Sequence, residues 1–180
     1  DTKNPDAKAQ MIVPRQEEVE YGVDHLKESN EFLIWTNEGG RKNFGLVKCS
    51  VESPSLSTDK GAVEVIPYDK DVFIEDGLVF QTFIALSFRR GGVMRCLIVD
   101  RKDFSIHEIE FEDASRDFYF DENKYESEYI QIKYSSPVTP PTVLAYYAKE
   151  RCLKVRKIFK VPGFIPSNYH VQSLQVRSRD

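Results

Sequence analysis

Few side chains in this 180-residue sequence have the type and spacing that catalysis requires. Asp24 directly precedes His25, and an acid beside a histidine could supply half of a Ser-His-Asp triad. The alternative is an ordinary His25, hydrogen-bonded within a strand or turn. His107 lies on the polar side of an alternating segment, where we expect solvation, and His170 receives no role. The sequence contains no Gly-x-Ser-x-Gly elbow, no His-Glu-x-x-His motif and no P-loop, so we assign no catalytic residue.

The sequence also gives little support for metal binding or redox chemistry. The three histidines lack the spacing of metal ligands, and Cys49, Cys96 and Cys152 form no Cys-x-x-Cys pair. We therefore predict no metal site and no cofactor. Each cysteine lies beside or inside an apolar run, which predicts small buried side chains in a reducing compartment. Together with the absence of an Asn-x-Ser/Thr acceptor, this favours a cytoplasmic protein.

The distribution of charge limits the kinds of partner. Net charge is −4, which argues against nucleic acid, and no apolar run approaches the roughly 20 residues of a membrane helix. Acidic clusters occur at Glu17, Glu18 and Glu20 and at Asp121-Glu122. We interpret them as solvated faces. The alternative is that they line a passage for basic peptides.

The elements that must position these residues repeat along the chain. An apolar run, a turn and a second apolar run begin at Phe32, at Phe83 and at Tyr129, which are 51 and then 46 residues apart. Glycine doublets separate the two runs in the first two copies, as expected for hairpin turns. A hairpin repeat of about 40–50 residues is typical of β-propeller blades, each with four strands.

The sequence predicts an all-β fold with about three four-stranded antiparallel blades, at 19–67, 72–112 and 117–160. The strands of the first blade are expected at 19–26, 31–38, 44–51 and 62–67. Those of the second are expected at 72–80, 82–90, 93–100 and 105–112. Those of the third are expected at 117–121, 128–136, 142–149 and 152–160. Residues 1–18 would end a preceding blade, with Met11–Val13 as its outer strand.

Three blades do not close a ring, so we expect the chain to be part of a longer protein. The first residue is not Met, and the closing Arg-Ser-Arg-Asp is no natural terminus for a compact fold. The end blades of an open arc each leave one apolar face bare. Self-association of the isolated chain would cover such a face.

Several motifs, in order and at suitable spacing, are similar to those of a known family. They are Tyr-Gly-Val-Asp-His at 21–25, Lys-Asn-Phe-Gly-Leu at 42–46, Tyr-Ser-Ser and Thr-Pro within 134–140, and Val-Pro-Gly-Phe at 161–164. They resemble oligopeptidase B, of the prolyl oligopeptidase family of serine peptidases. The Asp-His and Lys-Asn-Phe-Gly-Leu motifs favour this branch over prolyl oligopeptidase proper.

The resemblance implies that the chain is the C-terminal part of a seven-bladed propeller. That propeller caps an α/β-hydrolase domain, toward which 161–180 would form the connection. The parent enzyme would cleave short basic peptides after Arg or Lys, and the propeller would act as a gating lid. No residue here matches a triad position, so the chain alone is expected to be inactive. The alternatives are a non-catalytic interaction scaffold and the propeller of a proline-specific oligopeptidase.

Overall fold

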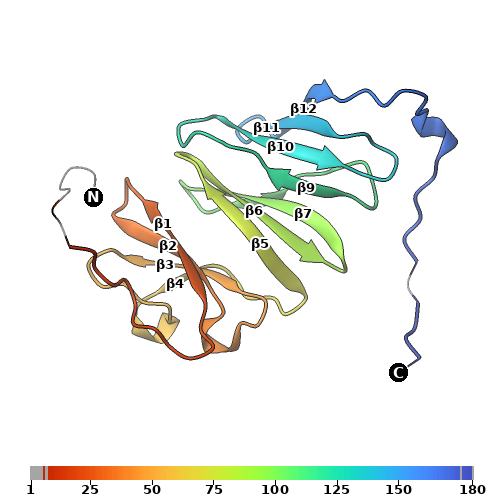
Figure 1. Ribbon diagram of the computed structural model, residues 1–180. Coiled ribbons are helices and arrows are strands. Elements are labelled where there is room, and N and C mark those ends of the chain that lie inside the picture. Colours follow the sequence, from red (N-terminus) through yellow and green to blue (C-terminus); the bar gives the residue numbers. More distant parts are fainter. Residues whose placement is uncertain (1–5, 7, 175, 180) are drawn as a thin grey trace. The chain divides into compact units, whose positions relative to one another are not determined.

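A computed structural model describes residues 6, 8–174 and 176–179. Within these residues the fold is all-β, with three four-stranded antiparallel sheets whose strands follow chain order (Figure 1). The chain divides into two compact units, Asp1–Lys70 and Asp71–Asp180, which we describe separately.

The first unit is one sheet with its own apolar cluster. Its strands are β1 (Tyr21–Leu26), β2 (Glu31–Thr36), β3 (Gly45–Ser50) and β4 (Val63–Ile66). Short 3-10 turns, η1 (Glu38–Gly40) and η2 (Thr58–Lys60), lie in the connections before β3 and β4. Six buried residues form the cluster: Val13, Ile34, Val47, Cys49, Leu56 and Ala62.

The second unit contains the other two sheets. One consists of β5 (Val72–Val79), β6 (Phe83–Arg90), β7 (Val93–Asp100) and β8 (Ile106–Glu108). The other consists of β9 (Asp117–Phe120), β10 (Tyr129–Ser135), β11 (Thr142–Tyr147) and β12 (Cys152–Ile158). A single cluster of thirteen buried residues draws members from both sheets, so the two sheets pack face to face.

Strand β10 shows why the sequence folds this way. Ile130, Ile132 and Tyr134 alternate with polar residues and point into the shared cluster, because successive side chains of a strand face opposite sides. Gln131 and Lys133 therefore lie on the other face. Sheet β9–β12 thus has a buried inner face and a second face, which we call the outer face.

A glycine doublet makes the tightest turn of the second unit. Arg90 pairs with Val93, so Gly91 and Gly92 alone connect β6 to β7. Both have positive φ, 59° and 78°, as a two-residue hairpin turn with the right twist requires. The doublet was predicted as a hairpin turn, and this is confirmed.

All twelve predicted strands are present; β7 has the predicted bounds, and the other eleven are shorter at one or both ends. The largest difference is β8, expected over 105–112 but ending at Glu108, after which the chain crosses to the next sheet. The predicted strand Met11–Val13 is absent. Residues 12 and 13 are bends, and the carbonyl of Val13 accepts a hydrogen bond from the Tyr21 hydroxyl (3.0 Å). After Ile158 the described residues contain no further strand, only a 3-10 turn, η3 (Pro166–Asn168).

Candidate functional site

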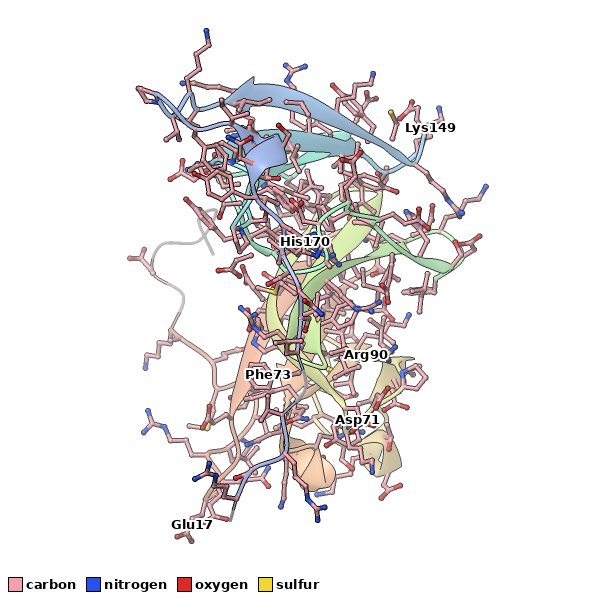
Figure 2. All side chains as sticks on the ribbon, turned by 90° about the vertical axis from the view of Figure 1, so that its right-hand side faces the viewer. Glu17, Asp71, Phe73, Arg90, Lys149 and His170 are labelled. Atoms are coloured by element: carbon pink, nitrogen blue, oxygen red, sulfur yellow. The ribbon has the colours of Figure 1, made fainter. Side chains whose placement is uncertain are left out.

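The structure separates the Asp24-His25 pair. The two residues are neighbours in β1, so their side chains leave the strand on opposite faces and do not form half of a triad. The exposed imidazole of His25 contacts the ring of Phe32 edge-on, at 5.8 Å between centroids. His170 is exposed, on the extended segment after η3 (Figure 2).

The prediction that His107 is solvated is wrong. Its Nε2 lies 2.8 Å from the hydroxyl of the buried Tyr146, so that a side chain of β8 in one sheet meets a side chain of β11 in the next. The ring is half-buried. Desolvation, reinforced by the positive charge of Arg151, lowers the pKa of His107 below its usual value, although Asp100 opposes the shift. The lowered pKa favours the neutral form of the imidazole.

The three cysteines are free thiols, and the prediction that they are buried holds for two of them. Cys49 and Cys96 are buried, while Cys152, at the start of β12, is only half-buried. Burial raises the pKa of the Cys96 thiol far above its usual value, so this side chain stays a neutral hydrophobic group.

The acidic clusters differ in character. Glu17, Glu18 and Glu20 are exposed, as predicted. Asp121 is not simply solvated, because it accepts from Lys133 Nζ (2.9 Å) and from Gln131 Nε2 (2.6 Å). The hydrogen bond from Lys133, followed by that from Gln131, lowers the pKa of Asp121.

Asp113 forms a polar junction that sequence reasoning missed. Its Oδ2 accepts from the Tyr134 hydroxyl (2.6 Å) and from Thr139 Oγ1 (2.7 Å), which fastens the β8–β9 connection to the β10–β11 hairpin. Burial alone would raise its pKa, but hydrogen bonds from Tyr134, Thr139 and Ser136, helped by Arg116, outweigh burial and lower it. The Tyr-Ser-Ser…Thr-Pro motif was the available signal, and these residues serve structure here.

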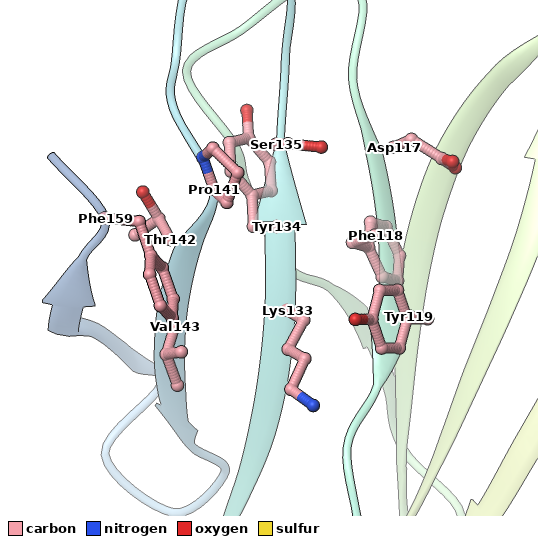
Figure 3. Close-up of a pocket in the computed structure, with 10 residues that line it drawn as sticks. All are labelled: Asp117, Phe118, Tyr119, Lys133, Tyr134, Ser135, Pro141, Thr142, Val143 and Phe159. Atoms are coloured by element: carbon pink, nitrogen blue, oxygen red, sulfur yellow. The ribbon is translucent and has the colours of Figure 1, made fainter. Parts of the chain in front are cut away.

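The outer face of sheet β9–β12 carries a hollow of about 500 Å³ (Figure 3). Tyr119, Lys133 and Val143 line it from three strands, and Phe159 closes one side just after β12. The Tyr119 and Phe159 side chains are 62% and 45% exposed, which is high for large apolar groups within a folded sheet. The lining residues include no histidine.

No group of three or more His, Cys, Asp or Glu side chains within the described ranges is placed to hold a metal ion. None of the helical segments described is long and apolar enough to cross a membrane.

The four-stranded meanders define the class of domain, a partial β-propeller. Residues 1–158 match the family described as "Prolyl oligopeptidase, N-terminal beta-propeller domain", and the chain belongs to that family. Two curated relatives are dipeptidyl aminopeptidase BI of Pseudoxanthomonas mexicana and protease 2 of Moraxella lacunata. The first is 26% identical over 171 residues, covering 94% of this chain and 23% of that protein. The second is 24% identical over 162 residues, covering 88% of this chain and 22% of that protein.

Solved structures agree on the fold. Oligopeptidase B from Trypanosoma brucei, in a closed form with covalently bound antipain, superposes with a TM-score of 0.79 at 26% identity, over 88% of this chain and 23% of that one. Oligopeptidase B from Leishmania major superposes with a TM-score of 0.80 at 24% identity, over 93% of this chain and 25% of that one. The chain therefore spans about a quarter of the length of its relatives. The expected family and fold class are confirmed.

Proposed function

We propose that this chain is the C-terminal part of the gating propeller of a cytoplasmic serine oligopeptidase that cleaves short peptides after Arg or Lys. Its sheets form part of a lid. An α/β-hydrolase domain of the same parent chain, joined through 161–180, supplies the nucleophile. The lid admits short peptides and excludes folded proteins, and it limits water around the reaction. The isolated chain is inactive.

One observation carries the proposal. The chain superposes along 88% of its length on a portion of an oligopeptidase B, at 26% identity. The arrangement of the described side chains is compatible with a lid, since Asp24 and His25 point to opposite faces of β1 and the His107 ring lies within hydrogen-bonding distance of the Tyr146 hydroxyl between two sheets. Free thiols at Cys49, Cys96 and Cys152 support a reducing compartment.

The substrate class is tested on the parent protein. Short fluorogenic peptides ending in Arg, Lys or Pro are compared with peptides that report release of an N-terminal dipeptide, and with a long polypeptide containing the same Arg site. We expect cleavage after Arg and Lys in short peptides and resistance of the long one. Preference for Pro or for dipeptide release would replace the proposed specificity.

The lid assignment has its own tests. The 180-residue chain alone should not hydrolyse Arg substrates, and serine-inhibitor-sensitive hydrolysis by it would refute the assignment. The parent gene gives a second test. A region after Asp180 that encodes a Gly-x-Ser-x-Gly elbow supports the peptidase, whereas further blades alone would favour an interaction scaffold.

A further inference from the structure

Strand β8 is the shortest of the described strands. It has three residues, Ile106–Glu108, and it lies at the outer edge of its sheet, where β7 is its single neighbour in the ladder. An ion pair joins Glu108 to Arg95 of β7 (2.9 Å), but it lies at the surface and adds little. Elements with few buried contacts open locally at low cost, so β8 can move while the rest of its sheet stays folded.

His107 is the side chain through which β8 meets the other sheet of the second unit. Its Nε2 lies 2.8 Å from the hydroxyl of Tyr146 in β11, and the two ring centroids are 6.0 Å apart. Because side chains alternate along a strand, His107 is the one residue of β8 on this side, and Ile106 points the other way. Both sheets belong to the second unit, so this contact is complete within the chain.

Two charged groups act on His107 in opposite directions. Burial of the ring and then the positive charge of Arg151, in the turn before β12, lower the pKa of His107. Asp100, at the end of β7, opposes them, but its Oδ1 already accepts from the backbone N–H of Lys102 (2.7 Å). Burial raises the pKa of Tyr146, so its hydroxyl stays uncharged. The ionisable groups near that hydroxyl are a guanidinium and two thiols: Arg151, Cys96 and Cys152.

A proton is therefore bound more readily by His107 in water than by His107 against β11. In the cation both ring nitrogens are donors, so Nε2 cannot accept the hydroxyl hydrogen of Tyr146. In water an imidazole has a pKa near 6.5, which is above the pKa of His107 in the closed structure. As the pH falls from about 6.5 toward the lowered pKa, the population with the ring in water grows by up to tenfold per pH unit.

We propose that β8 is an acid-operated flap. When His107 is protonated, β8 separates from β11 and carries the imidazolium into water, while the other strands of both sheets keep their ladders. At neutral pH the flap is closed over the outer end of the contact between the two sheets. The flap is a property of these two sheets and does not depend on the peptidase function, so either proposal can fail without the other.

The buried thiol of Cys96 reports the position of the flap. The carbonyl of Cys96 accepts from the backbone N–H of Ile109, directly after β8 (2.9 Å), so movement of β8 uncovers this part of β7. In a Cys152→Ser background, an aromatic disulfide that reacts with thiols in acid labels Cys96 and Cys49. Cys49 belongs to the cluster of the first unit and is the internal control. Between pH 7.5 and 5 the labelling rate of Cys96 relative to Cys49 should rise at least threefold. This ratio cancels the pH dependence of the thiol reaction.

Variants of the histidines separate the flap from general loosening. His107→Gln cannot titrate and should abolish the relative rise, whereas His170→Gln, at an exposed histidine, should leave it unchanged. His107→Lys is charged throughout this range and should label rapidly at Cys96 even at pH 7.5. Circular dichroism confirms that each variant is folded. A rise that persists in His107→Gln, or equal rates of change at Cys96 and Cys49 in the chain with both histidines intact, would overturn the proposal.

Discussion

At the residue scale, a few polar side chains between sheets do more than the histidines that first suggest chemistry. Asp113 is the clearest case. It joins the segment before β9 to the hairpin after β10 by two hydrogen bonds, and one donor is the hydroxyl of the buried Tyr134. Removing the acceptor leaves that hydroxyl unsatisfied, which is more costly than losing an exposed bond.

We expect Asp113→Ala to lower the free energy of unfolding by about 2 kcal/mol at pH 7, measured by urea denaturation. Glu112→Ala, at the exposed neighbouring residue, should be close to neutral. The pKa of Asp113 is lower in the folded state than its ordinary value near 4, so its contribution is present above that pH. As pH falls through the folded pKa, the difference between wild type and Asp113→Ala should shrink. A difference that is constant down to pH 2 would contradict this role.

His107 should make the free energy of unfolding depend on pH in a higher range than Asp113 does. Because its folded pKa is lowered, the unfolded chain binds a proton more readily below about pH 6.5. The contribution of His107 to the free energy of unfolding should therefore be complete at neutral pH. It should decline as the pH falls below about 6.5, toward the folded pKa. His107→Gln keeps a hydrogen-bonding group for Tyr146 but cannot titrate, and its urea midpoint should change less between pH 7.5 and 5. Parallel curves for the two proteins would refute the assignment.

At the element scale, close cross-strand contacts fix individual strands. In the first unit Gly22 pairs with Trp35, and the indole lies where a Cβ at residue 22 would be. The glycine thus allows Trp35 to cover the backbone of β1. A larger side chain would have to displace the ring.

Gly22→Ala should destabilise the chain by roughly 1–3 kcal/mol through overpacking. The check is a double-mutant cycle with Trp35→Leu, measured by chemical denaturation. Combining the two changes should recover much of the loss, because the smaller side chain makes room for the methyl group. Strictly additive effects would show that the indole does not limit residue 22.

The strands and turns could be predicted because their signals lie within a few neighbouring residues of the sequence. Alternation in β10 and the Gly91-Gly92 turn are readable within a few residues, and the same signals gave all twelve strands. Contacts between sheets were not readable. His107 and Tyr146 are 39 residues apart, and Asp113 and Thr139 are 26 apart. The alternation of β8 predicted that His107 lies on a solvated side, but the neighbouring Ile106 is 44% exposed and His107 faces the next sheet.

At the scale of the whole molecule, the two units differ in the size of their apolar clusters. The second unit has thirteen buried residues in one cluster between two sheets, whereas the first has six. A hydrogen bond also ties the two sheets of the second unit, since Arg101 Nη1, which holds the Phe80 carbonyl of its own sheet, donates to the hydroxyl of Tyr125 between β9 and β10, each at 2.8 Å.

Native-state hydrogen exchange should therefore show the strongest protection in β6, β7 and β10, with earlier opening of β1–β4. Residues 71–180 expressed alone should retain a cooperative unfolding transition. Equal protection in both units, or an unfolded 71–180 fragment, would show that the smaller unit supports the larger one.

The order of strands has a consequence for how the chain reaches this fold. Every ladder joins strands that are neighbours in sequence, so each pairing closes only a short loop. The connections at 67–71 and 109–116 lie between sheets, and a break in either would interrupt no ladder. Sheets can therefore form one after another as the ribosome releases them. The ladders of each sheet are therefore self-contained, whereas the apolar cluster of the second unit is complete only when both of its sheets have formed.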